Sequence, residues 1–289
     1  MTKVKIIDYD RLYRILASNV KCNCLMTTKE PDRFLRKIPC QELGLILDWD
    51  DTLTEHSSWR ITNNAFSKVG TRKEILLLDK ISNYYHSIER ERPLTSTEMK
   101  AWQRTNMEMY VNCGLNLRCL NKEIERSEMY SFGVILLKYL LEKGTKVCIS
   151  SSGIKNVIEK TLELSDINPN KYGNLQINAT ELCFNKKGIV TDWEKDSIVT
   201  CKNKPWITSS FSKIWNIEHR NIFAVGDGNT DINVLDLVSK EATMIIFSPE
   251  HKRELMTKQK FDLVSNKAHG FVKKDFGIIT NFFIKTMEA

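Results

Sequence analysis

The sequence predicts an α/β fold, a Rossmann-like parallel sheet with a helical cap inserted after its first strand. The run "LGLILD" at 43–48 is continuously apolar, which is typical of a strand buried on both faces of a parallel sheet. Residues from about 58 to 143 then show helical periodicity and no strong strand pattern. After them, short apolar runs alternate with helical stretches, as in parallel α/β sheets. These runs are "KVCIS", "SIVTC", "NIFAVGD" and "ATMIIFS".

This order divides the chain into two predicted domains. Residues 1–57 and 144–289 would form the α/β core, and residues 58–143 the helical cap. The region before the first strand looks helical and polar, with an amphipathic helix in "DYDRLYRILAS" and a second short helix in "EPDRFLRKI" that begins near a proline.

The bulk composition predicts a soluble globular protein. No apolar run is long enough to cross a bilayer, and the N-terminal residues do not read as a secretory signal, so we expect a cytoplasmic location without membrane contact. The eight cysteines are scattered, which favours reduced thiols. The net charge of +7 suits an anionic small substrate as well as nucleic acid, but no basic run supports nucleic acid. The oligomeric state is not indicated.

Polar residues follow three of the predicted strands. In a parallel sheet, ligands bind beyond the carboxyl ends of the strands, so these side chains can converge at one edge. They are Asp48, Asp50, Asp51 and Thr52 after the first strand, Ser150, Ser151, Ser152 and Gly153 after the second, and Asp227 and Asp231 of "GDGNTD" after the fourth.

Clustered carboxylates near a buried strand end are costly unless a cation or a proton compensates them. An oxygen-rich set without Cys or His favours Mg²⁺ over zinc. One aspartate can then attack a phosphate held by the metal, and a second can protonate the leaving oxygen. The "SSSG" turn and a lysine would share the phosphoryl oxygens. Each motif alone is also a common turn, cap or calcium loop; the ordered set of three predicts a catalytic site.

The ordered set resembles the motifs of the haloacid dehalogenase superfamily of phosphohydrolases. "LILDWDDTL" matches its Asp-x-Asp-x-Thr, "VCISSSG" its strand-end Ser or Thr, and "VGDGNTD" its Gly-Asp-x-x-x-Asp. The resemblance implies that Asp48 is the nucleophile and Asp50 the general acid/base. It also implies a magnesium site formed by Asp48, the main-chain carbonyl of Asp50 and Asp227, with Asp231 as a further ligand or a supporting carboxylate.

The same resemblance assigns the phosphate-binding groups. Ser151 would donate to the phosphate, with Ser150 as the alternative, and Ser152 and Gly153 would complete the substrate-binding turn. The superfamily also has a lysine before its last catalytic strand.

"TCKNKPW" offers two lysines for this role, Lys202 and Lys204. Either one, taken alone, is more often a surface lysine. An Asn-Lys pair in the family discussed next selects Lys204.

The position of the insert is that of the helical-cap branch, which includes phosphoserine phosphatases and pyrimidine 5′-nucleotidases. "YYHSIERERPLTSTEM", the helix with "MEMY", and "IVTCKNK" are similar to the cytosolic pyrimidine 5′-nucleotidase family, and this similarity covers about residues 28–289. It implies a nucleoside 5′-monophosphate as substrate and Glu108 as a base contact. The chain departs from the family pattern at Met109, where an aromatic residue is expected, and at Trp49 and Asp51.

We therefore expect a magnesium-dependent phosphomonoesterase that acts through an aspartyl phosphate, with a 5′-nucleotidase as the preferred interpretation. The alternatives are a phosphatase for another small phosphomonoester such as phosphoserine, a non-catalytic phosphate-binding module, and phosphotransfer to an acceptor other than water.

Overall fold

A computed structural model describes residues 4–16, 24–27, 30–227, 231, 233–238, 240–248 and 258–287 of the chain. Within them, eight strands form one sheet in the order β1-β2-β10-β9-β8-β3-β4-β5. All neighbouring pairs are parallel except β2 with β10. The strands are β1 (Val4–Ile6), β2 (Leu25–Thr27), β3 (Gly44–Leu47), β4 (Lys146–Ile154), β5 (Leu175–Thr180), β8 (Ile222–Gly226), β9 (Thr243–Ser248) and β10 (Gly270–Lys273). The predicted α/β class is confirmed.

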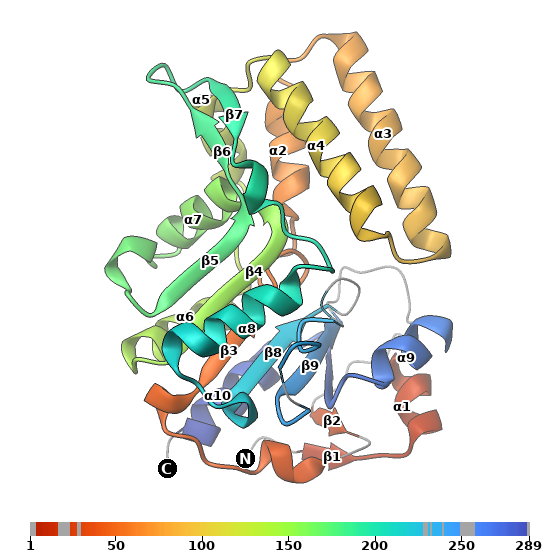
Figure 1. Cartoon of the computed structure of the whole chain (residues 1–289), viewed down its shortest axis with the longest axis vertical. Coiled ribbons are helices and arrows are strands. Elements are labelled where there is room, and N and C mark those ends of the chain that lie inside the picture. Colours follow the sequence, from red (N-terminus) through yellow and green to blue (C-terminus); the bar gives the residue numbers. More distant parts are fainter. Residues whose placement is uncertain are drawn as a thin grey trace.

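Helices cover both faces of this sheet, and the residues of β3 alternate between the two layers (Figure 1). Leu45 and Leu47 pack in the cluster that contains α6 and α10, whereas Ile46 packs in the cluster with α1, α8 and α9. This two-sided burial explains why the strand is continuously apolar. The helices are α1 (Tyr9–Leu16), α6 (Ser131–Glu142), α7 (Lys155–Leu164), α8 (Lys204–Trp215), α9 (Lys258–Ser265) and α10 (Gly277–Met287).

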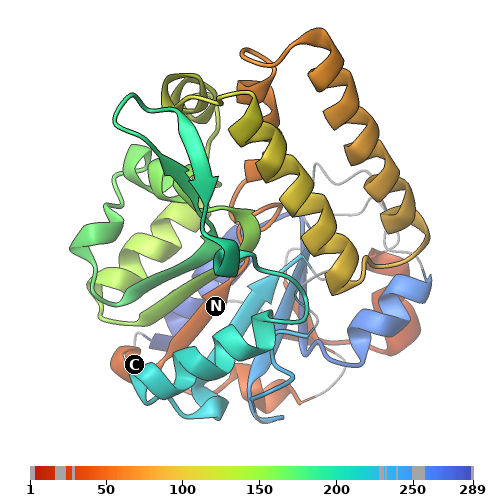
Figure 2. The ribbon, with the colours of Figure 1, turned by 45° about the horizontal axis from the view of Figure 1, so that its top comes forward.

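Four helices follow β3 directly and form a separate layer. They are α2 (Ser58–Phe66), α3 (Arg72–Glu91), α4 (Ser96–Asn112) and α5 (Leu117–Ile124). Capping boxes at Thr71 and Thr95 begin α3 and α4. The antiparallel hairpin of β6 (Leu182–Phe184) and β7 (Val190–Trp193) joins the same apolar cluster as this layer. In Figures 1 and 2, α4 lies across the side of the sheet to which the arrowheads of β8 and β9 point.

The prediction of a strand in "SIVTC" is wrong. Ser197 ends a short 3-10 helix, Lys195–Ser197, and 198–203 is an irregular segment that leads into α8. Ile198 and Val199 are each only 3% exposed, so the apolar run marks a buried loop. The strand that follows β4 in the chain is β5, whose sequence "LQINAT" is more polar.

The region before β3 also differs from the expectation. Helix α1 is where the amphipathic pattern predicts it, but the second helix is only a 3-10 turn, Pro31–Phe34, and two short strands, β1 and β2, extend the sheet. Further 3-10 helices are Cys40–Glu42, Pro169–Lys171 and His219–Asn221.

The division into core and cap remains a prediction, but the packing of α6 bears on its boundary. Leu136, Leu137 and Leu140 of α6 belong to the apolar cluster that contains Leu45 of β3. We therefore propose that the cap ends before Ser131, and that α6 belongs to the core.

Two further expectations concern the chain as a whole. The seven cysteines in the described part of the chain, from Cys24 to Cys201, are free thiols, and Cys22 lies outside it. Among the described residues, no helix combines the length and apolar character needed to span a bilayer.

Candidate active site

Three carboxylates meet beyond the carboxyl ends of β3 and β8, which are neighbours in the sheet. Asp48 follows β3, and its main-chain N–H donates to Val225 O of β8 at 2.9 Å. Asp48, Asp227 and Asp231 each present an oxygen atom, and these oxygens all lie within 4.8 Å of one another. Gly226 makes this approach possible, because a Cβ there would lie 2.4 Å from the Asp231 carboxylate. Gly228, Asn229 and Thr230 of the same motif are outside the described residues.

Lys204, the first residue of α8, supplies a positive charge to this cluster. Its side chain is fully buried, and its Nζ donates to Asp48 Oδ1 at 2.9 Å and also to Asp231 Oδ1. Burial alone would lower the pKa of Lys204, but the charges of Asp231 and Asp48 outweigh that effect and raise it. The alternative lysine, Lys202, is exposed to solvent. Of the two candidates, the structure therefore brings only Lys204 to Asp48.

Asp48 has an environment suited to a nucleophile that is paired with a cation. Burial, reinforced by the charge of Asp231, raises the pKa of Asp48 to about 7, although Lys204 acts in the opposite direction. Thr52 Oγ1 lies 3.5 Å from Asp48 Oδ2, at the limit of a hydrogen bond. The intervening turn places Asp51 in the left-handed region, at φ 62°, which Asp tolerates better than most residues.

Asp50 is not one of the three clustered carboxylates, and both of its side-chain oxygens are hydrogen-bonded to one residue, Ser58. The Ser58 N–H donates to Asp50 Oδ1 at 2.7 Å, and the Ser58 hydroxyl donates to Asp50 Oδ2 at 3.0 Å. Burial raises the pKa of Asp50 to about 6, although both hydrogen bonds favour its charged form. A carboxyl with this pKa can release and regain a proton near neutral pH, as a general acid/base must.

The predicted "SSSG" turn is instead the last part of strand β4, where the register against β5 shifts, and it borders the site on the side opposite β8. Ser151 is fully buried, and its Oγ accepts a hydrogen bond from the Gly153 N–H at 3.0 Å. A Cβ at Gly153 would lie 2.0 Å from Ser58 Oγ and 3.0 Å from Asp50 Oδ2, so this position requires glycine. Ser150, the alternative phosphate donor, is also buried, and its hydroxyl has no hydrogen-bond partner among the described residues.

The residues around Asp48 fit a magnesium ion. Their donors are all oxygens, which Mg²⁺ prefers. Three carboxylates and one lysine leave a formal charge of −2, which a divalent cation balances. Asp231 Oδ2 is buried without a hydrogen-bond partner within the described part of the chain, so it is free to bind a cation. The Asp50 side chain is hydrogen-bonded to Ser58, and the superfamily resemblance implies that Asp50 would bind the cation through its main-chain carbonyl.

Helix α4 meets the site through residues that the sequence did not single out. Gln103 and Asn106 are 4% and 2% exposed, whereas the predicted base contact, Glu108, is exposed to solvent. Gln103 Nε2 and Trp59 Nε1 both donate to Ser152 O, at 3.2 Å and 3.1 Å. No spacing rule connects residues so far apart in the chain, so only the fold reveals these contacts. Glu108 as a base contact stays a prediction.

A model of the family described as "Pyrimidine 5′-nucleotidase (UMPH-1)" matches residues 49–271, which is most of the chain. The chain belongs to this family. It is a phosphoric monoester hydrolase of the haloacid dehalogenase type, and its resemblance to these proteins is confirmed. None of the curated protein sequences matches it.

Solved structures of other phosphohydrolases share the fold of this family member. Cytosolic 5′-nucleotidase IIIB bound to cytidine has a TM-score of 0.67 at 15% identity, over 88% of each chain. A phospho-aspartyl intermediate analogue of phosphoserine phosphatase has a TM-score of 0.56 at 19% identity, over 83% of this chain and 98% of that one. A probable phosphoserine phosphatase from Vibrio cholerae has a TM-score of 0.59 at 16% identity, over 86% of this chain and 66% of that one.

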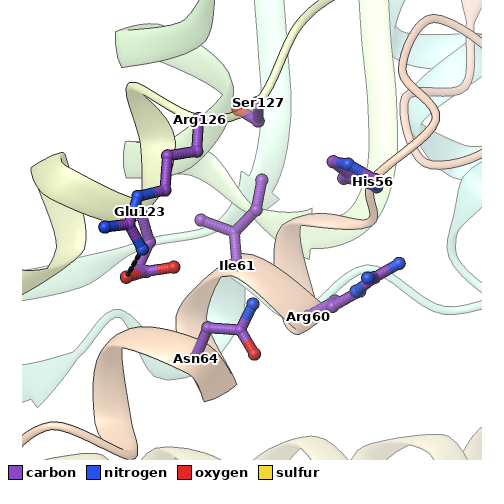
Figure 3. A pocket seen from close by; sticks show the side chains of 7 residues that line it. All are labelled: His56, Arg60, Ile61, Asn64, Glu123, Arg126 and Ser127. Atoms are coloured by element: carbon purple, nitrogen blue, oxygen red, sulfur yellow. Dashed lines mark hydrogen bonds and ion pairs between the residues drawn. The ribbon is translucent and has the colours of Figure 1, made fainter.

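This 5′-nucleotidase family member has a hollow of about 260 Å³ away from the acidic cluster, between α2 and the end of α5 (Figure 3). Its lining contains none of the predicted site residues, and the Arg126 guanidinium is paired there with Glu123 at 2.8 Å. The hollow is lined by His56, Arg60, Ile61, Asn64, Glu123, Arg126 and Ser127.

Proposed function

We propose that the chain is a magnesium-dependent 5′-nucleotidase that hydrolyses nucleoside 5′-monophosphates through a phosphorylated Asp48. The observation that carries this proposal is the buried contact of Lys204 with Asp48 and Asp231, next to strand β4, whose last residues include Ser151. In a member of a nucleotidase family, this arrangement supports Asp48 as the nucleophile, Lys204 as the positive charge and Ser151 as the hydroxyl donor.

In the first step, a carboxylate oxygen of Asp48 attacks the phosphorus, and the bond from phosphorus to the 5′ oxygen of the nucleoside breaks. Asp50 gives its proton to that departing oxygen, for which a pKa of about 6 is suitable. Lys204 and Ser151 stabilise the negative charge on the phosphoryl oxygens. Bound Mg²⁺, held by Asp48, Asp227 and Asp231, would neutralise part of the phosphate charge.

In the second step, Asp50 acts as the base. It is now a carboxylate, and it takes a proton from a water molecule that attacks the phosphorus of the phosphorylated Asp48. The bond between phosphorus and the Asp48 oxygen breaks, which releases inorganic phosphate. Lys204 then pairs again with the free Asp48 carboxylate, and Ser58 holds Asp50 in position for both proton transfers.

The substrate class rests on the family match, whose description is that of a pyrimidine nucleotidase, and on the nucleotidase neighbour, whose structure contains cytidine. The phosphoserine phosphatase neighbours leave phosphoserine as the second candidate, and their likeness concerns the fold. Nucleotides and phosphoserine are both small phosphorylated metabolites. A cytoplasmic location suits an enzyme that acts on either of them.

The test is phosphate release from a panel of 5′-nucleotides, phosphoserine and sugar phosphates, with Mg²⁺ and with EDTA. We expect release from pyrimidine 5′-nucleotides that requires Mg²⁺ and is abolished in Asp48→Asn. Phosphoserine as the best substrate would overturn the nucleotidase assignment. No release from any compound by the folded, magnesium-loaded protein would overturn the hydrolase mechanism in favour of a binding module.

Hydrolysis and phosphotransfer share the phosphorylated aspartate, so they need a separate experiment. Adding an unlabelled nucleoside during turnover of a nucleotide that is labelled on its phosphate distinguishes hydrolysis from phosphotransfer. Label found only in inorganic phosphate supports hydrolysis, whereas label in the added nucleoside identifies phosphotransfer.

A further inference from the structure

The side-chain amide of Gln103, in α4, is hydrogen-bonded to two separate segments of the core. Its Nε2 donates to Ser152 O at 3.2 Å and to Val199 O at 3.4 Å, and its side chain is 4% exposed. Because an amide nitrogen carries two hydrogens and both neighbours are carbonyl acceptors, the nitrogen must face them, which fixes the orientation of the amide.

The first of these parts is the end of β4, which carries the predicted phosphate donor. Ser152 directly follows Ser151, and its carbonyl also accepts a hydrogen bond from Trp59 Nε1 of α2. Gly153 on its other side bonds back to Ser151 Oγ. The position of Ser151 is therefore tied to the carbonyl that Gln103 holds.

The second part is the segment that leads to the catalytic lysine. Val199 precedes Thr200, whose carbonyl accepts a hydrogen bond from the Lys204 N–H at 3.1 Å and whose N–H donates to Asn203 Oδ1 at 2.6 Å. These bonds make 199–204 a compact turn that begins α8. Ser96, at the start of α4, adds a hydroxyl contact of 2.9 Å with Thr200.

We propose that Gln103 is a positioning residue, which fixes the end of β4 with Ser151 and the segment with Lys204 in one geometry when α4 lies against the sheet. The inference rests on the proposed function, because it assigns Ser151 and Lys204 to the phosphoryl group. Through Gln103, the packing of α4 against the core would be coupled to the geometry of the phosphate site. If α4 moved away, both Gln103 hydrogen bonds would break together.

The test compares Gln103→Met, which keeps the length of the side chain without its donors, and Gln103→Glu, which replaces the donor with a third acceptor. Asn112→Asp, at the exposed end of α4, is the matched control for the change from amide to carboxylate. We expect both Gln103 variants to lower kcat by about 10- to 100-fold. We expect KM to change much less, because the groups that Gln103 positions act in the transition state.

Two readouts separate positioning from other roles. The loss of kcat should be equal for a nucleotide and for p-nitrophenyl phosphate, and a loss confined to the nucleotide would overturn the proposal in favour of a contact with the base. Hydrogen exchange should rise together in residues 150–154 and 199–204 of Gln103→Met and stay native in Asn112→Asp. Native kcat and native exchange in Gln103→Met would also overturn it.

The outcome is distinguishable from failure of the proposed function. A native protein that releases no phosphate removes the nucleotidase assignment, while the exchange experiment still reports whether Gln103 holds the two segments. If the wild-type protein is active and the Gln103 variants have the same kcat, the proposed function stands and the positioning role is overturned.

Discussion

Lys204 shows how one residue sets the charge balance of the site. It is fully buried and contacts Asp48 and Asp231, and these two carboxylates would repel each other without it. Removing one partner of a buried ion pair is strongly destabilising, because an uncompensated charge remains. In the proposed mechanism the same positive charge stabilises the phosphoryl oxygens, so stability and activity would both depend on this side chain.

Lys204→Met should therefore lower the free energy of unfolding of the metal-free protein by about 3–5 kcal/mol at pH 8 and abolish phosphate release. The cost should be smaller at pH 5, because Asp48, with its pKa of about 7, is then protonated and needs no partner. Urea denaturation at the two pH values measures both effects. Lys202→Met is the control, and inactivation by this change instead would assign the catalytic lysine to Lys202.

The residues of the site were predicted from the sequence to different degrees. Asp48, Asp227 and Asp231 follow apolar strands, and parallel strands place their carboxyl ends at one edge, so their convergence is predictable. Ser58 and Gln103 carry no such signal. Ser58 is eight residues from Asp50 across an irregular turn, and Gln103 reaches Ser152 and Val199 only because α4 folds back over the sheet.

Helix α2 acts at the scale of an element, because its first turn holds Asp50, the proposed general acid. The main-chain N–H and the hydroxyl of Ser58 both donate to Asp50, and the hydroxyl also accepts a hydrogen bond from the Ile154 N–H at 3.0 Å. The start of the helix thus connects Asp50 to the end of β4. Hydrogen bonds that favour the charged form lower a pKa, so their loss must raise it.

Ser58→Ala removes the hydroxyl donor and should raise the pKa of Asp50 above its value of about 6. The value of kcat/KM reports the first phosphoryl transfer. It should fall at high pH, because Asp50 then loses the proton that it must donate. The basic limb of the pH profile should therefore move to higher pH. Ser57→Ala is the control: it removes the N-cap of α2, at a cost of about 1 kcal/mol, and should leave that limb in place. An unmoved limb in Ser58→Ala would contradict the role of Asp50.

The elements of the fold were predictable where burial is two-sided. Strands β3 and β8 have no polar side chain, and β4 and β9 have the apolar runs "VCI" and "MIIF", since helices cover both faces of these strands. Strand β5 at the sheet edge is partly exposed and more polar, so its pattern is weak. "SIVTC" has the apolar pattern of a strand but is a buried loop whose main chain is hydrogen-bonded to Gln103. Periodicity reports burial, and it cannot distinguish a buried loop from a strand.

At the scale of the whole molecule, the acidic site links folding stability to pH and, in the proposed function, to magnesium. The pKa values of Asp48 and Asp50 are raised to about 7 and about 6, above their unfolded values near 4. Between these values the folded protein binds more protons than the unfolded chain, so the contribution of these two carboxyls to stability falls as pH rises from about 4 to 7. A cation that binds only the folded carboxylates opposes this loss.

Mg²⁺ should therefore raise the Tm more at pH 8 than at pH 5, because the carboxylates that bind it are ionised at the higher pH. Thermal unfolding with Mg²⁺ and with EDTA at both pH values measures this difference. Asp227→Asn should reduce the magnesium-dependent rise. A rise that is equal at both pH values, or unchanged in Asp227→Asn, would place the cation elsewhere.

The most direct measurement is to trap the phosphorylated enzyme. Acid quenching during turnover of a 5′-nucleotide, followed by borohydride, reduces an aspartyl phosphate to homoserine, which mass spectrometry of the peptide locates. We expect homoserine at position 48 in a sample quenched with substrate and Mg²⁺, and none when either is left out. Homoserine at position 50 or 51, or at no position in a protein that is turning over, would contradict the assignment of Asp48 as the nucleophile.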